Sequence, residues 1–137
     1  MALKGAAQHK RRLKNLSGAA VLRVAGAIVY EGADTIKAEA QRLISAGSVS
    51  GKGHVPSRPG EPPNFDTGVL SAHIEARQTG PASAEVASRA PYAAALEFGT
   101  SKMAARPYMR PARDKKAPEI QRKFVEKMNK LIKASGR

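Results

Sequence analysis

The sequence predicts an α+β domain in which a long N-terminal helix and a C-terminal helix pack on a small antiparallel sheet. Three observations favour this class: an apolar repeat at helical spacing after residue 20, a second one near the C-terminus, and two short strand-like segments between them. The chain has 137 residues, which is enough for one hydrophobic core and too few for two of useful size. We therefore expect a single domain over residues 1–137.

The first helix is predicted from a stripe of apolar residues at steps of three and four. We expect it to begin after an N-cap at Ser17 and to stop at Gly47. Gly26 and Gly32 each weaken a helix by roughly 1 kcal/mol relative to alanine. Because Gly32 falls on the stripe, we expect another backbone to approach closely there. The stripe consists of Val21, Ala25, Ile28, Gly32, Ile36, Ala40 and Leu43.

Residues 47–66 are predicted to form one long exposed loop. Five Gly or Ser residues precede His54 and four Pro residues follow it, so neither a helix nor an inner strand can form. A loop of this length in a small domain is typical of a functional arm or of a disordered segment. We expect flexibility here, and we expect His54 to be exposed to solvent rather than to bind a ligand.

A short helical turn and a β-hairpin are predicted next. Asp66, Thr67 and Gly68 are suited to cap a turn that runs to Ala72. The strand candidates are His73–Gln78 and Ser83–Arg89, and the four residues between them form a reasonable hairpin connection. In the second strand Ala84, Val86 and Ser88 are expected on one face.

A short helix of roughly two turns is predicted over Tyr92–Phe98. Pro91 stands at a favoured first helical position, and Gly99 stands where a glycine C-cap is expected. Tyr92 and Phe98 are expected to pack in the core or in an interface rather than to bind a ligand. Glu97 is expected to be solvated or paired locally, or to meet a cation of a neighbouring subunit.

An extended arm over residues 100–111 and a final helix complete the chain. Arg106 and Arg110 both precede proline, which disfavours the α region. The final helix is expected to run to about Ala134, with Pro118 in its first turn or at a kink near its start. Its apolar face contains Ile120, Phe124, Met128, Leu131 and Ile132.

The composition indicates a small core. There are three Phe, three Tyr and no Trp, and alanine supplies much of the 42% apolar content. We therefore expect a partner, most simply further copies of the chain, to cover remaining apolar surface. The chain has no cysteine, which excludes disulfides and thiolate metal sites. Since no run of 18 apolar residues exists, we expect a soluble protein without a membrane segment.

The net charge of +13 is placed at the two ends of the chain. Residues 1–14, in a basic N-terminal segment over 1–16, carry five cations and no acid, and residues 102–137 carry a net +9. Such ends favour a polyanion, including passive contact with nucleic acid, or an acidic protein neighbour. The alternative is a surface whose charge only keeps the protein soluble.

The search for chemistry predicts no enzyme. His9, His54 and His73 lie far apart, and no phosphate-binding, dinucleotide-binding or nucleophile motif is present, so no catalytic, cofactor or metal residue is predicted. A small basic nucleic-acid-binding protein of ribosomal or nucleoid type is the alternative function. It is disfavoured because the final helix has no aromatic residue on its polar face for base stacking.

Four short motifs resemble a family of small phage proteins. They are Thr67-Gly68-Val69-Leu70, Tyr92-Ala93, Glu97-Phe98-Gly99-Thr100, and Pro107 to Ala112 with the sequence PYMRPA. Their order and spacing over about residues 18–134 are similar to the tail-component family of long-tailed phages, the gene-ten-like family of HK-type siphophages. The 47–66 loop is longer and richer in Gly and Pro than that pattern.

The resemblance implies a structural, non-catalytic virion protein of the neck or tail, assembled in the host cytoplasm. Such a protein would form a homo-oligomeric ring, by family symmetry a hexamer, which completes the tail tube as a terminator or joins it to the head as a connector. Its partners would be neighbouring connector and tail-tube proteins, with passive contact with packaged DNA. We predict that the subunit interface contains Tyr92, Glu97, Phe98, Arg106, Tyr108, Met109 and Arg110.

Overall fold

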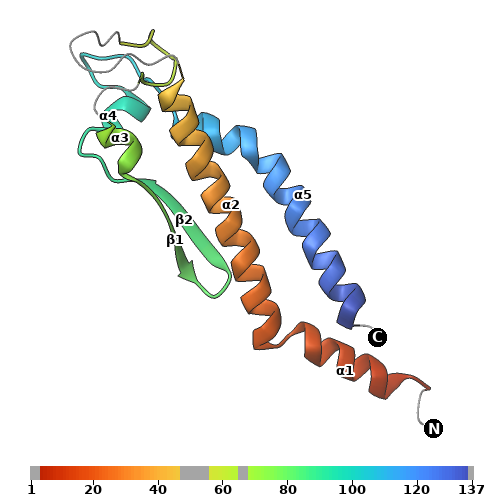
Figure 1. Ribbon diagram of the computed structural model, residues 1–137. Coiled ribbons are helices and arrows are strands. Elements are labelled where there is room, and N and C mark those ends of the chain that lie inside the picture. Colours follow the sequence, from red (N-terminus) through yellow and green to blue (C-terminus); the bar gives the residue numbers. More distant parts are fainter. Residues whose placement is uncertain (1–3, 47–55, 65–67, 136–137) are drawn as a thin grey trace.

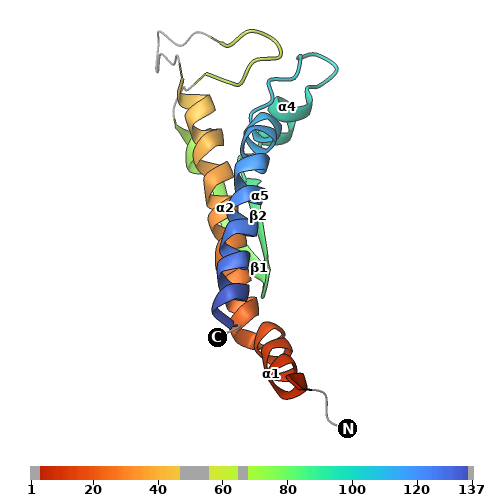
Figure 2. The same cartoon turned by 90° about the vertical axis from the view of Figure 1, so that its right-hand side faces the viewer.

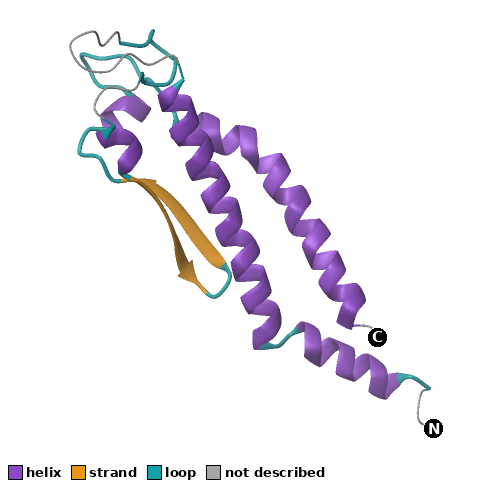
Figure 3. Cartoon of the chain, in the orientation of Figure 1, coloured by secondary structure: helices purple, strands orange, loops and turns teal. Residues whose placement is uncertain are grey.

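A computed structural model describes residues 4–46, 56–64 and 68–135. The chain forms two long helices with a two-stranded antiparallel hairpin beside them, so the predicted α+β class is confirmed (Figure 1; Figure 3). The central helix α2 lies between the hairpin and α5, and α1 extends away from one end. The elements are α1 (Ala6–Leu16), α2 (Ala19–Ser45), α3 (Val69–Ala72), β1 (Ile74–Gly80), β2 (Ser83–Ser88), α4 (Ala93–Phe98) and α5 (Met109–Ser135).

The N-terminal part contains a helix that the sequence analysis described only as a basic segment. Helix α1 ends at Leu16, and Ser17 closes it by donating its amide hydrogen bond to the Leu13 carbonyl at 3.0 Å. The predicted N-cap at Ser17 is therefore wrong, because Gly18 precedes α2 in an extended conformation. Within the described residues, no single helix is long and apolar enough to span a membrane. Helices α1 and α2 together have the length and composition of a span, but they meet at a 44° bend.

Two glycines set how closely α2 is packed. At Gly32 an added Cβ would lie 2.7 Å from Cγ2 of Ile120, so the close approach expected there is real but is made by a side chain of α5. The close backbone approach occurs instead at Gly26, where an added Cβ would lie 2.2 Å from the carbonyl oxygen of Pro81 in the hairpin turn. Gly26 thus allows the tip of the hairpin to rest on α2.

Replacing Gly26 with alanine is expected to lower stability. In a helix interior without close neighbours this change raises stability by about 1 kcal/mol. Here the new methyl group collides with the Pro81 carbonyl, and such overpacking costs typically ~1–3 kcal/mol. Thermal unfolding distinguishes the two effects by sign, and a higher melting temperature for Gly26→Ala would contradict the packing described.

The hairpin matches its prediction with small shifts of its ends. Strand β1 begins at Ile74 and β2 ends at Ser88, and these two residues are paired in the register. Val86 packs against the core and Ser88 hydrogen-bonds to it, as expected for residues on the inward face. The irregularity between Gln78 and Gly80 accompanies the turn at Pro81.

The core lies at the end of the molecule where the C-terminal half of α2 meets α3, α4 and the start of α5 (Figure 1). Toward α1, the molecule consists of α2, α5 and the hairpin in a thin arrangement, as the turned view shows (Figure 2). The main hydrophobic cluster is therefore small and lies at one end, while Ile28 and Ala33 of α2 are buried outside it. The buried residues of the cluster are Ala40, Ile44, Leu70, Ile74, Ala90, Ala93, Tyr108 and Ala112.

The predicted extended arm over residues 100–111 is wrong at both of its ends. Helix α5 starts at Met109, so Arg110 and Pro111 are helical, and Pro118 lies inside the helix. Proline is tolerated in a first turn because its missing N–H would have no helical partner there. Thr100 and Met103 close a turn through an N–H to carbonyl hydrogen bond of 2.8 Å. Only residues 104–107 have neither a helix nor a turn.

The 47–66 loop is described only over residues 56–64, which contain no helix or strand, as predicted. Two hydrogen bonds hold this part to residues 104–107. The amide of Gly60 donates to the Ala105 carbonyl at 2.9 Å, and Nε of Arg106 donates to the Ser57 carbonyl at 3.2 Å. The flexibility predicted for the 47–66 loop stays a prediction. Residues 47–55, with His54, and residues 65–67, with the predicted capping residues Asp66 and Thr67, lie outside the described residues.

Candidate functional site

The two most specific motifs of the sequence meet through the carboxylate of Glu97. This side chain, near the end of α4, accepts hydrogen bonds from the first amides of α5: Tyr108 at 2.9 Å, Met109 at 3.0 Å and Arg110 at 2.8 Å. The first amides of a helix have no partner within the helix, and the helix dipole favours a negative charge there. Glu97 therefore acts as the N-terminal cap of α5 from eleven or more residues away.

Tyr108 belongs to the core of its own chain. Its side chain is 0% exposed, and its hydroxyl donates a hydrogen bond of 2.6 Å to Oγ of Ser88. Burial raises the pKa of this hydroxyl, so it stays protonated and can donate. A side chain without accessible surface has none to offer a neighbouring subunit. We therefore correct the interface prediction for Tyr108 and assign it to the core.

The remaining predicted interface residues differ in how exposed their side chains are and in whether they are held by contacts within the chain. Phe98 is 82% exposed and is the most exposed large apolar side chain of the described residues, and Tyr92 is 43% exposed. Arg110 is exposed and pairs loosely with Asp114 at 4.0 Å. Met109 is half-buried against the core, and Arg106 holds the loop through Ser57. The surface open to a partner is thus formed by Tyr92, Phe98 and Arg110.

An apolar groove runs beside this surface, between the hairpin and α5. Its first part is a hollow of about 780 Å³ that contacts Phe98, Pro107 and Met109. Its second part, about 420 Å³, lies over α2 and is lined by Ile28, Ala33 and Ile120 among others. The two parts adjoin because both are lined by Ile36 and Val86. The groove is concave and mostly apolar, which is the character of a docking surface.

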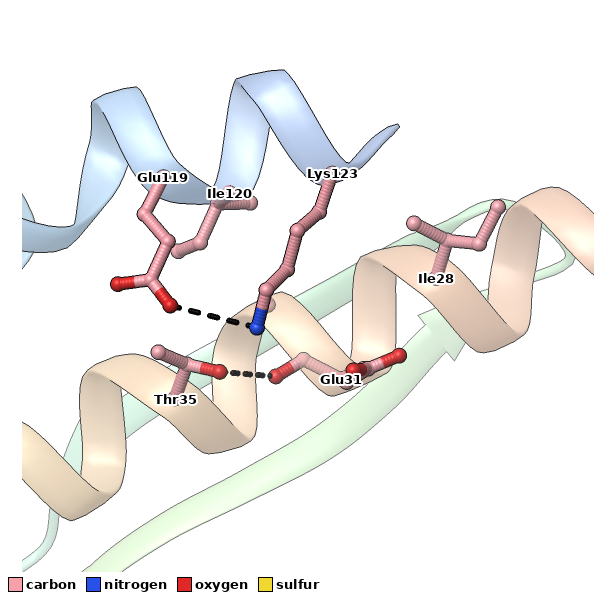
Figure 4. Close-up of a pocket in the computed structure, with 7 residues that line it drawn as sticks. Ile28, Glu31, Thr35, Glu119, Ile120 and Lys123 are labelled. Atoms are coloured by element: carbon pink, nitrogen blue, oxygen red, sulfur yellow. Dashed lines mark hydrogen bonds and ion pairs between the residues drawn. The ribbon is translucent and has the colours of Figure 1, made fainter. Parts of the chain in front are cut away.

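Ion pairs tie α5 to α2 along their seam. Glu39 of α2 is buried and accepts from Nζ of Lys115 at 2.9 Å and from Arg42 at 2.7 Å. Farther along, Lys127 of α5 pairs with Glu31 and lowers the pKa of that carboxyl. The narrow hollow between these pairs is shown in Figure 4, where Lys123 reaches Glu119 on its own helix at 3.3 Å. The ion pairs between the two helices therefore help to hold α5 against α2, and these lysines already have carboxylate partners.

The Glu39 cluster predicts an acid-sensitive fold. The hydrogen bond from Arg42, followed by that from Lys115, lowers the pKa of Glu39 from 4.5 to about 2. Because the pKa of Glu39 is lower in the folded than in the unfolded protein, its ionised form stabilises the fold. This stabilisation is complete above the unfolded pKa and is lost as the pH falls toward the folded pKa. Denaturant unfolding between pH 6 and pH 2 should therefore show a loss below about 4.5 that Glu39→Gln reduces. An identical pH profile for Glu39→Gln would contradict this role.

The fold is that of a small α+β protein. Its distinctive feature is an exposed aromatic beside an apolar groove, and no three His, Asp or Glu side chains of the described residues are grouped as metal ligands. Residues 7–99 match the family model described as "Bacteriophage HK97-gp10, putative tail-component". Because the match covers more than half of the chain, the protein belongs to this family of phage tail components, which confirms the resemblance.

The matched region covers part of the four motifs. It begins within α1 and ends at Gly99, so it includes the first two motifs and Glu97 to Gly99 of the third, but neither Thr100 nor residues 107–112. No curated protein and no solved structure shows significant similarity to the chain. A tail-component family is a structural one, which agrees with the prediction that the protein is not an enzyme.

Proposed function

We propose that the protein is a subunit of the phage neck that forms a homo-oligomeric ring, completes the tail tube and joins it to the head. Membership in a tail-component family supports a virion role at the tail. A ring of six copies would match the symmetry expected for tail tubes from the family resemblance. Its partners would be the adjacent connector and tail-tube proteins, and assembly would take place in the host cytoplasm.

The observation that carries this proposal is the exposure of Phe98. A phenylalanine that is 82% exposed leaves apolar area in water that a partner can bury at about 25 cal/mol per Å². The backbone around Phe98 is held in place, because Gly99 ends α4 with a positive φ of 76° and the Arg106 amide donates to the Leu96 carbonyl at 2.6 Å. The exposed side chain is thus carried by a well-anchored helix end.

The ring interface follows from pairing Phe98 with the apolar groove of the next copy. Phe98 lines only the first part of the groove, so the distal part, lined by Ile120 and Phe124, is a different site on the same chain. Contact between two different surfaces is heterologous, and repetition of such a contact closes into a ring when the rotation allows it. Tyr92 and Arg110 would lie at the edge of this contact, where polar groups remain near solvent.

The neck role is tested by deleting the gene from the phage that encodes the protein. We expect such infections to yield filled heads and separate tails in electron micrographs, with few infectious particles. Adding the purified protein to the lysate should join heads to tails and restore infectivity. Joined, infectious particles in the absence of the protein would contradict the proposal.

A further inference from the structure

The cations of the two basic regions have different surroundings. Five lysines of α5 form ion pairs within the described chain: Lys115, Lys116, Lys123, Lys127 and Lys130. Their acidic partners are on α2 or on α5 itself. These ion pairs offset part of the charge of α5, which keeps a net positive charge because its nine Lys and Arg residues outnumber the five carboxylates that pair with them.

Helix α1 shows the opposite situation. Lys10, Arg11, Arg12 and Lys14 are exposed, and none of them forms an ion pair with any acid of the described residues. The helix has no acidic residue in its first turn and contributes no buried residue to the core. It extends away from the body of the molecule in both views (Figure 1; Figure 2). Its uncompensated charge is thus presented on a projecting element.

A polar hollow lies where α1 meets the end of α5. It has a volume of about 380 Å³ and is lined by Gly5, Gln8, His9, Arg11, Arg12, Asn15 and Ser135. Among the described residues no carboxylate lines it, and both arginines contribute. One guanidinium group can donate two parallel hydrogen bonds to two oxygens of a phosphate, and amide side chains can donate to the same oxygens. The lining is therefore suited to a phosphate group and not to an apolar or cationic ligand.

We infer that α1, with the hollow at its junction with α5, binds the phosphate backbone of duplex DNA without reading its sequence. Binding of this kind comes from cations that replace the counterions of the phosphates. Helix α1 spans about 16 Å over its 11 residues, which matches several phosphates along a groove edge. The helix has no Phe, Tyr or Trp side chain for stacking on bases, so single-stranded or sequence-specific recognition is not expected.

Two other partners fit α1 less well. A membrane-surface helix needs a broad apolar face with large side chains, whereas α1 has only Leu13 and Leu16 beside alanines. The centre of a protein interface is apolar and poor in charge, whereas α1 carries four cations within five residues. The proposed DNA-binding surface shares no lining residue with the ring interface, because its only contribution from α5 is Ser135, whereas the groove is lined by α5 residues nearer the start of that helix.

The test compares two variants of the full chain that lose the same charge. One carries Lys10→Gln, Arg11→Gln, Arg12→Gln and Lys14→Gln, and the control carries Lys116→Gln, Lys123→Gln, Lys127→Gln and Lys130→Gln on α5. Fluorescence anisotropy measures binding to a labelled mixed-sequence DNA duplex as salt is raised. Circular dichroism checks folding, and sedimentation measures the oligomeric state, which reports on the ring separately.

We expect the α1 variant to bind DNA at least ~10-fold more weakly at 0.1 M salt, with a salt slope smaller by about 3–4, and the control to lose less than ~3-fold. Equal losses in the two variants, or no loss in the α1 variant, would overturn the assignment. Unchanged DNA binding together with lost binding to vesicles containing phosphatidylserine would also overturn it, in favour of a lipid partner. A DNA-binding change with unaltered sedimentation leaves the ring proposal untouched.

Discussion

Replacing Tyr108 with alanine is expected to destabilise the folded chain itself, by about 3–5 kcal/mol. The side chain is 0% exposed at the centre of the core, where α5 begins, so its removal leaves a cavity among Ile44, Ile74 and Ala112. Small domains have total stabilities of about 5–15 kcal/mol, so a loss of this size removes a large share of them. Urea unfolding followed by circular dichroism measures the change.

The matched control for this prediction is Tyr108→Phe. It keeps the ring in the core and removes only the hydroxyl that donates to Oγ of Ser88. The expected loss is about 1 kcal/mol, the usual value of one hydrogen bond. If Tyr108→Ala left the unfolding midpoint unchanged but dissociated the assembly, Tyr108 would belong to the interface after all.

Replacing Glu97 with alanine is expected to lower stability by about 2–4 kcal/mol. Loss of an ordinary cap costs ~0.5–2 kcal/mol, and here one carboxylate serves three amides of α5. The same change frees α4 from α5 and loosens the placement of the adjacent Phe98. Hydrogen exchange of the amides of residues 108–110 should accelerate in step with the loss of stability.

The conservative variant Glu97→Gln separates charge from geometry. A glutamine side chain retains one acceptor oxygen but not the negative charge at the helix N-terminus. We therefore expect Glu97→Gln to lower the free energy of unfolding, but by less than Glu97→Ala does. Wild-type protection of these amides in Glu97→Ala would show that water replaces the carboxylate without cost and would contradict the capping role.

Most of the regular elements could be predicted because their signals are local. The apolar stripe of α2, the paired strands and the C-cap at Gly99 each depend on residues only a few positions apart. The start of α5 could not be predicted in this way. The rule that disfavours helix before proline was applied to Arg110, and it is outweighed by a cap from Glu97, which no spacing along the chain indicates.

The sequence predicted where the candidate site lies better than it predicted what each residue does there. Residues 92–110 do form the most distinctive surface, and Phe98 is presented on it. An aromatic between two prolines suggests an arm, however, and only the folded chain shows that Tyr108 is enclosed. The charge pattern was similarly incomplete, because Lys127 and its partner Glu31 are far apart in the sequence and meet only through helix packing.

The central claim is that an exposed Phe98 joins identical subunits into a ring. Native mass spectrometry of the wild type, Phe98→Asp and Val125→Asp tests it most directly, because Val125 is also exposed, at 51%, but lies on α5 away from the motifs. We predict a closed oligomer, a hexamer by family symmetry, for the wild type and Val125→Asp, and a folded monomer for Phe98→Asp. An oligomer that persists in Phe98→Asp, or one that is lost equally in both variants, would contradict the account.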